Sequence, residues 1–181
     1  PAMTEGRVEW VVGHALRHHL GMDTHIHGQD GEWRHDSYPP LAADRPVTIL
    51  GLGALGPACG QALHPLGLPV TGWSESPKAS THMRCLHGDD GLTAALTGAE
   101  IVILLLPQTP QTENILNADT LALLARGAFV INPGRGPLID DAALLTALYS
   151  GQVRHATLDV FRTEPLPKDD PYWAHPNVTV T

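Results

Sequence analysis

The sequence predicts an α/β fold, in which a long helix precedes a doubly wound parallel sheet. From residue 47 onward, short apolar segments alternate with helical stretches, which is the pattern of parallel strands joined by crossover helices. The first apolar segment runs directly into a glycine-rich turn, Gly51-Leu52-Gly53-Ala54-Leu55-Gly56, and a helical stretch follows it. A strand, a glycine turn and a helix in this order are typical of the first unit of such a sheet.

Residues 1–44 precede this pattern and are expected to form an interface helix and a connector. The helix is predicted from Thr4, which can cap its start, to about Met22. Its apolar residues share one face and are Val8, Val11, Val12, Ala15, Leu16 and Leu20. The connector, 23–44, is polar and rich in His, Gly and Pro, with Trp33 and Tyr38 as its only large apolar anchors. We expect the helix to pack against another domain or a second subunit.

Residues 45–181 are expected to form the main, dinucleotide-binding domain. Its strands are predicted at 47–50, 70–73, 83–86, 101–106, 128–131, 156–160 and 178–180. Glycines stand where helices should end, at Gly67, Gly98, Gly127 and Gly151. Good N-cap residues stand where helices should begin, at Asp90, Asn117 and Asp140.

The glycine turn predicts a site for the pyrophosphate of a dinucleotide, as in Rossmann-type folds. Gly51 permits the tight turn, Gly53 leaves the backbone open to a phosphate, and Gly56 lets the helix lie close to the strand. Free amides at the start of the helix, predicted at 58–66, bind the phosphates with help from the helix dipole. Pro57 is compatible with this site, because amides in a first helical turn lack partners.

The end of the second strand leaves the choice between NAD(H) and NADP(H) open. An acid about 20 residues beyond the glycines holds ribose hydroxyls, whereas cations hold a 2′-phosphate. Ser74 stands at the expected position, and Glu75 and Lys78 follow it. Glu75 could hold ribose hydroxyls, Lys78 and the serines could hold a phosphate, or the segment could be a solvated turn.

Two later strands end in polar segments that should meet at one crevice. Residues 107–112 follow the strand at 101–106, and Asn132-Pro133-Gly134-Arg135-Gly136 follows the strand at 128–131. The carboxyl ends of parallel strands line the ligand site of a doubly wound sheet. An arginine between two glycines there has no evident packing purpose. Arg135 is therefore a candidate clamp for a carboxylate, with a surface arginine as the alternative.

Together these segments resemble the D-isomer-specific 2-hydroxyacid dehydrogenase family over the whole chain. The resemblance rests on the glycine turn, on 107–112, on 132–140, and on Leu158-Asp159-Val160-Phe161 followed by Glu164-Pro165-Leu166-Pro167. The opening Met3-Thr4-Glu5, the helix after it, and residues 31–33 and 72–74 are similar to the glyoxylate/hydroxypyruvate reductase A branch. That branch favours NADPH.

The resemblance implies roles for individual residues. Arg135 would hold the carboxylate and carbonyl oxygen of the substrate, Glu164 would orient and tune a catalytic histidine, and Asp159 would contact the nicotinamide end. Also implied near the cofactor are Pro107, Thr112, Pro133 and the amides of Ala54 and Leu55. Hydride transfer to a 2-keto acid needs a cation for the carboxylate, a proton donor and a dry, fixed nicotinamide. Arg135 supplies the first of these.

The sequence departs from the family pattern in two ways. The family's catalytic histidine stands in a Pro-His pair soon after the last strand, whereas this sequence ends at Thr181, and His175 is expected to belong to the loop before that strand. The substrate domain and the C-terminal tail are also absent, so we expect a piece of a longer protein with little turnover by itself. The second departure is Glu75, which stands where the reductase A branch tends to have a phosphate-binding arginine, and an acid repels a phosphate.

Composition argues against several classes of partner. A formal net charge of −8 and a pI near 5.7 argue against nucleic acid. No apolar run approaches the roughly 20 residues that span a bilayer, and no signal peptide opens the chain, so a cytoplasmic protein without a membrane partner is predicted. Cys59 and Cys85 are isolated and predicted to be reduced. His14 and His18 share a helix face but lack the other ligands of a zinc site, so no metal is predicted.

Two functional hypotheses follow. The leading one is the cofactor-binding part of an oxidoreductase that reduces a small 2-keto acid, of the glyoxylate or hydroxypyruvate type, by hydride transfer from NADPH or NADH. The alternative is a non-catalytic dinucleotide-binding or redox-sensing module, in which the bound nucleotide alters association through the first helix. The apolar face of that helix also predicts a homodimer.

Overall fold

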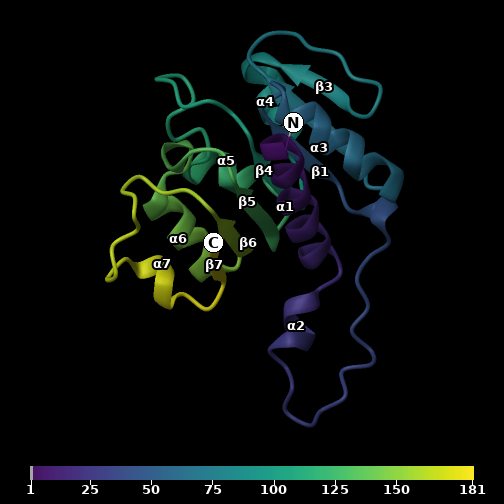
Figure 1. The fold of residues 1–181 in the computed structure, drawn as a ribbon, viewed down its shortest axis with the longest axis vertical. Coiled ribbons are helices and arrows are strands. Elements are labelled where there is room, and N and C mark those ends of the chain that lie inside the picture. The colour runs from purple at the N-terminus through teal and green to yellow at the C-terminus, as the bar shows by residue number, and fades with distance from the viewer. Residues whose placement is uncertain (1) are drawn as a thin grey trace.

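The computed structural model describes residues 2–181, which form a seven-stranded sheet with the strand order β3-β2-β1-β4-β5-β6-β7. Every neighbouring pair of strands is parallel. The strands are β1 Val47–Leu50, β2 Val70–Ser74, β3 Arg84–His87, β4 Ile101–Leu104, β5 Ala128–Asn132, β6 Val153–Leu158 and β7 Val178–Val180. The predicted doubly wound α/β fold is confirmed (Figure 1).

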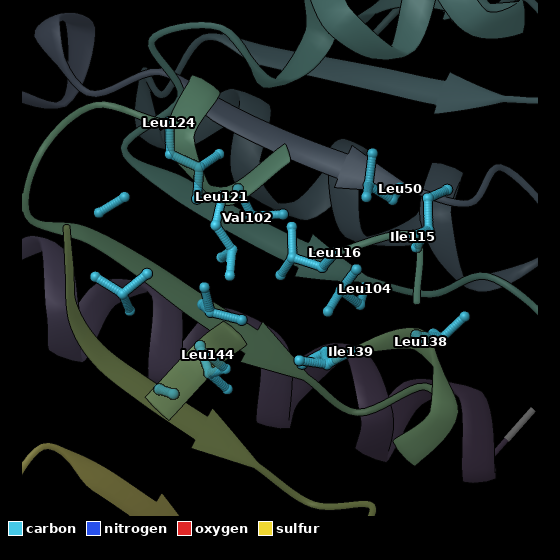
Figure 2. Packing of buried hydrophobic residues seen from close by; sticks show 14 of the residues in the cluster. Leu50, Val102, Leu104, Ile115, Leu116, Leu121, Leu124, Leu138, Ile139 and Leu144 are labelled. Carbon is cyan, nitrogen blue, oxygen red and sulfur yellow. The ribbon is translucent and has the colours of Figure 1, made fainter. Parts of the chain in front are cut away.

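Helices cover both faces of this sheet. They are α1 Ala2–His19, α2 Met22–Ile26, α3 Leu55–Leu63, α4 Gly88–Leu96, α5 Ala118–Leu123, α6 Asp141–Ser150 and α7 Pro171–Ala174, with 3₁₀ turns η1 Ala42–Asp44, η2 His64–Leu66 and η3 Gly136–Leu138. Consecutive strand residues point to opposite faces, so Ile49 packs with residues of α1 and α3, and Leu50 packs with residues of α4, α5 and α6. Figure 2 shows part of the Leu50 cluster. Two buried faces explain why β4 is apolar throughout and why β1 has a single polar residue, Thr48.

The first helix differs from its prediction in its bounds and its packing. Because α1 begins at Ala2, Thr4 lies inside the helix, and the prediction that Thr4 caps its start is wrong. Gly21 adopts a left-handed conformation (φ 63°) after α1, and the short helix α2 follows within the predicted connector. Val11 and Ala15 are fully buried in the same core cluster as α3, so α1 contributes to the core of this domain. That α1 also contacts another domain or subunit remains a prediction.

The bounds of β4, β6 and α3 differ from the predicted ones by two residues or more, whereas those of β2, β3 and β5 differ by one residue. β4 ends at Leu104. The Leu105 N–H donates to the Leu50 carbonyl (2.7 Å), and beyond this hydrogen bond the chain leaves the sheet as a loop. β6 spans Val153–Leu158 and not 156–160, since the polar residues at its start concealed the strand. α3 begins at Leu55 and not at residue 58, which leaves Pro57 in the first turn, where its missing N–H has no cost.

The predicted helix ends mostly agree with the structure. The four glycines expected at helix ends all have positive φ. Gly67, Gly98 and Gly151 follow helix ends, whereas Gly127 lies in the turn before β5, beyond the end of α5 at Leu123, so that prediction is wrong. Asn117 and Asp140 cap α5 and α6 through their side chains. The prediction for Asp90 is wrong, because α4 begins after His87 and Asp90 lies in its first turn.

The connector between α2 and η1 has no large apolar anchor. Trp33 is 85% exposed and Tyr38 is 83% exposed, so the prediction that they anchor the segment is wrong for this domain. In Figure 1 the connector extends away from the sheet beyond α2. A bidentate ion pair between Arg34 and Asp30 (2.7 Å) braces its tip. The connector is therefore a braced loop that presents aromatic side chains.

Candidate functional site

The candidate site lies where the winding of the sheet changes direction. From β1 the chain continues to β2 and β3 on one side, and then crosses to β4 on the other side of β1. The loops after β1 and β4 therefore leave neighbouring strand ends and diverge. In open α/β sheets, ligands bind at such a switch point.

Gly51 and Gly56 are required by the shape of the turn after β1. Gly51 has a φ of 112°, and a Cβ on it would lie 2.5 Å from the carbonyl carbon of Leu105. A Cβ on Gly56 would lie 1.9 Å from the Gly51 carbonyl oxygen. The first glycine thus lets the β4 loop pass close to the turn, and the second lets α3 start beside the strand.

Gly53 differs from its two neighbours, because no protein atom lies within 4 Å of where its Cβ would be. The described fold does not need glycine at this exposed position, whereas a ligand that approaches the backbone does. Ala54, at the N-cap of α3, has no side chain that could cap the helix, so the amides of Leu55 and Gly56 stay open to an anion. This turn fits the pyrophosphate of a dinucleotide.

Three polar residues at the end of β2 were predicted to face the ribose. Ser74 is the last residue of β2, is buried, and donates its hydroxyl to the Ser76 carbonyl (2.7 Å). Glu75 and Lys78 are exposed, and within residues 2–181 neither joins an ion pair. A charged side chain is therefore available for either cofactor: Glu75 for the ribose hydroxyls of NAD(H), and Lys78 for the 2′-phosphate of NADP(H).

The loop after β4 is held together by Thr112. This residue is 4% exposed; its hydroxyl donates to the Pro107 carbonyl (2.7 Å) and accepts from the Thr109 N–H (2.8 Å). The hydroxyl is thus used within the loop, while Pro107 is exposed at its start. A direct contact of Thr112 with the cofactor remains a prediction.

The loop after β5 carries Arg135 in an exposed position. Arg135 donates to the neighbouring Gly134 carbonyl (2.7 Å). The buried side chain of Asn132 accepts from the Gly134 N–H (3.0 Å) and donates to the Arg135 carbonyl (3.0 Å), so it fixes the backbone that carries the arginine. Asn132 was not among the predicted site residues, although an asparagine at the end of an apolar strand, directly before Pro-Gly, marks its position.

Pro133, in the same loop, is buried and receives a contact from the first helix. The Arg7 guanidinium of α1 donates to the Pro133 carbonyl (3.3 Å). Arg7 was not among the predicted site residues, because 126 residues separate it from Pro133 and no local pattern joins the two. The start of α1 therefore lies at the β5 loop.

The loop after β6 carries the two predicted acids, both exposed. The Asp159 N–H donates to the Asn132 carbonyl (3.1 Å), which joins this loop to the β5 loop. The Asp159 carboxylate accepts from the Thr181 hydroxyl (2.6 Å). Glu164 lies farther along and accepts from the Phe161 N–H (3.0 Å). Asn132 thus links the segments of Arg135 and Asp159, whereas the carboxylate of Glu164 turns back to its own loop.

The histidines of α1 belong to a different place, a polar network between α1 and β6. His18 is bonded to the Thr157 hydroxyl (2.9 Å) and stacks on Phe129, and its burial lowers its pKa to about 3. The Arg17 guanidinium donates to Asp23 (2.6 Å) and lowers the pKa of that carboxyl. Within residues 2–181, no group of three or more side chains is arranged to hold a metal ion.

His175 lies in the loop between α7 and β7, as expected. It is buried, and its Nδ1 accepts from the Asn177 N–H (3.0 Å). The ring therefore shapes the turn into β7. Among the described residues, no helix has the length and apolar character needed to span a bilayer.

Comparison with known proteins agrees with this geometry. Residues 10–181 match the family model described as D-isomer specific 2-hydroxyacid dehydrogenase, NAD binding domain. The chain is 40% identical over 181 residues to glyoxylate/hydroxypyruvate reductase A of Serratia proteamaculans, covering 99% of this chain and 57% of that relative. It therefore spans little more than half the length of this curated relative.

Solved structures show the same likeness. A D-isomer specific 2-hydroxyacid dehydrogenase from Xanthobacter autotrophicus, in complex with NADPH and MES, is 46% identical with a TM-score of 0.95, over 100% of this chain and 75% of that one. An NADPH-dependent glyoxylate/hydroxypyruvate reductase from Sinorhizobium meliloti, in complex with NADP and sulfate, is 37% identical with a TM-score of 0.91, over 96% of this chain and 56% of that one. The chain belongs to the D-isomer specific 2-hydroxyacid dehydrogenase family and carries its NAD-binding domain.

Proposed function

We propose that this chain is the cofactor-binding part of an enzyme that reduces small 2-keto acids, of the glyoxylate and hydroxypyruvate type, to 2-hydroxy acids. The observation that carries the proposal is Arg135, an exposed arginine on a fixed loop at the same sheet edge as the glycine turn. The names of the relatives from Serratia proteamaculans and Sinorhizobium meliloti support it.

A reduced nicotinamide, when bound, supplies the hydride for the keto carbon. Residues of this chain bind and orient the other reactant. The Arg135 guanidinium binds the carboxylate of the substrate and donates to its carbonyl oxygen. This hydrogen bond strengthens as the oxygen becomes negative during hydride transfer. Glu164 orients the imidazole of the catalytic histidine that the family resemblance implies, and this imidazole gives the proton to the oxygen. Asp159 flanks the nicotinamide end.

NADP(H) is the proposed cofactor, with NAD(H) as the alternative. NADP or NADPH is present in the relatives from Xanthobacter autotrophicus and Sinorhizobium meliloti, and Lys78 offers this chain a cation for the 2′-phosphate. Glu75 opposes that phosphate. Calorimetric titration with NADPH and with NADH tests the choice: tighter NADPH binding supports Lys78 and the serines, and tighter NADH binding makes Glu75 the ribose ligand.

Replacement of Arg135 tests the reaction. In the natural full-length polypeptide, Arg135→Ala should lower kcat/KM for glyoxylate by at least about 100-fold, because the charged hydrogen bonds to the substrate are lost, and should leave NADPH affinity nearly unchanged. Arg126→Ala is the matched control, since Arg126 donates only to the Ser150 carbonyl (2.7 Å), before β5 at the opposite edge of the sheet. Full activity of Arg135→Ala would show that Arg135 does not bind the substrate, whereas no glyoxylate reduction by the parent would favour the non-catalytic dinucleotide-binding module.

We also propose a cytoplasmic homodimer that forms through α1 and the connector, with no nucleic acid or membrane partner. Support comes from the braced connector, in which Trp33 and Tyr38 are exposed side chains of the kind that interfaces bury. Sedimentation equilibrium of the parent and of Trp33→Ser tests it. We expect the parent to be a dimer and Trp33→Ser to dissociate at higher protein concentration. A monomeric parent would rule out the proposed homodimer.

A further inference from the structure

Arg162 contacts both neighbouring loops from its own place in the loop after β6. Its guanidinium donates to the Ile139 carbonyl (2.8 Å) and to the side-chain oxygen of Asn114. It also lies 3.5 Å from the carboxylates of Glu113 and Asp141. It donates to the Pro137 carbonyl as well (3.4 Å), so five main-chain and side-chain groups surround one cation.

These contacts come from two other loops that carry the proposed site. Glu113 and Asn114 belong to the segment after β4, whereas Ile139 belongs to the segment after β5. The backbone already joins those two segments, since the Asn114 N–H donates to the Pro137 carbonyl (2.8 Å) and Leu116 forms a parallel bridge with Ile139. Arg162 adds the β6 loop to this pair.

The backbone around Arg162 is shaped to allow these contacts. Asn114 has a φ of 53°, the only positive φ of a non-glycine residue within residues 2–181, a conformation that asparagine tolerates better than most residues. A Cβ on Gly136 would lie 2.1 Å from the carbonyl carbon of Phe161, so the β5 and β6 loops touch through their backbones. Loops packed this closely keep a fixed spacing.

We infer that Arg162 is a positioning residue that fixes the loop of Glu164 relative to the loop of Arg135. The inference rests on the proposed function, in which Arg135 binds the substrate and Glu164 orients the imidazole. Groups on separate loops keep a productive geometry only if the loops do. A planar guanidinium suits this task, because it donates in several fixed directions to carbonyl and carboxylate oxygens, which an ammonium group does not.

Arg162→Met tests the inference, because it removes the donors and keeps an unbranched side chain. In the natural full-length polypeptide, kcat for glyoxylate reduction should fall by about tenfold or more, and its pH profile should shift, because Glu164 no longer holds the imidazole in place. NADPH affinity, measured by calorimetry, should change by less than about twofold, because the contacts of Arg162 within residues 2–181 do not include the glycine turn that binds the pyrophosphate in the proposed function. Arg162→Lys should restore only part of kcat. Arg126→Met is the matched control and should change neither quantity.

A double-mutant cycle with Glu164→Gln shows whether Arg162 acts through Glu164. In the Glu164→Gln background, Arg162→Met should add much less than it costs alone. Equal losses in both backgrounds, or full activity of Arg162→Met, would overturn the inference. If Arg162→Met fails to fold, Arg162→Lys decides, and an unchanged pH profile in that variant overturns the inference. An active parent and full activity of Arg162→Met would remove only the inference, whereas no glyoxylate reduction by the parent would remove the proposed function.

Discussion

The Gly51 carbonyl oxygen lies so close to the α-carbon of Gly56 that a Cβ there would lie 1.9 Å from it. This contact seats the first turn of α3 on the end of β1. Gly53, between the two, would place a Cβ with no protein atom within 4 Å. The turn therefore contains two glycines that the fold requires and one that it does not.

Alanine at positions 53 and 56 should separate stability from binding. Gly56→Ala should lower the free energy of unfolding by about 2 kcal/mol or more, because the methyl group meets backbone atoms that cannot move aside. Gly53→Ala should change it by less than about 0.5 kcal/mol and lower NADPH affinity by about tenfold. Urea denaturation and calorimetry measure the two effects. Equal destabilisation by both variants, or unchanged binding by Gly53→Ala, would contradict the assignment.

The fold could be predicted because the local signals agree with one another. The β1 strand is apolar on both faces, ends in a glycine turn, and precedes a helix, and each feature indicates the same βαβ unit. The prediction failed where tertiary contacts decide. In β6, Arg154 and His155 follow the first residue, Val153, and their polar side chains conceal a strand, although His155 bonds to the Thr179 hydroxyl (2.8 Å) of the neighbouring strand.

The site was predictable only as far as its short motifs extend. The glycine turn and Arg135 stand in local patterns with a clear chemical purpose. Arg162 does not, because 48 residues separate it from Asn114, and only the folded chain brings the two together. Arg7 is separated from Pro133 by 126 residues, so no local pattern could associate them.

Charge reversal at Glu75 should change the cofactor preference. Glu75→Arg places a second cation near Lys78, so the ratio of NADPH to NADH affinity should rise by about tenfold. Calorimetric titration with both cofactors measures this ratio. Glu9→Arg reverses an exposed acid on α1 and is the matched control for net charge. An unchanged ratio in Glu75→Arg would place the side chain away from the ribose.

The two thiols should differ in reactivity. Cys59 is fully buried, and burial raises its pKa to about 12, so it forms little thiolate. Cys85 is half-buried on the edge strand β3. At pH 8, a disulfide reagent such as Ellman's reagent should modify Cys85 in the folded chain and both thiols in urea. Cys85→Ser should remove the native reaction, and fast reaction of Cys59 would contradict its burial.

Mild acid should destabilise the contact between α1 and the sheet. Burial lowers the pKa of His18 from 6.5 to about 3 and that of His155 to about 4. Arg17 and Asp23 lie near both rings, His14 lies near His18, and His27 and His175 lie near His155. Because the unfolded chain takes up protons that the folded chain refuses, the stability from neutral histidines is complete above pH 6.5 and is lost as pH falls toward the folded pKa values.

This acid effect can be measured as a slope. Between pH 6 and pH 5, the free energy of unfolding should fall with a slope that includes about 1 kcal/mol per pH unit from His18. His18→Gln should keep a polar partner for Thr157 and lose this part of the slope, even if its stability is lower at every pH. His25→Gln, at an exposed position on α2, should keep the parent slope. Equal slopes in the parent and in His18→Gln would show that His18 accepts a proton in the folded chain. That result would contradict a buried, neutral His18 ring stacked on Phe129.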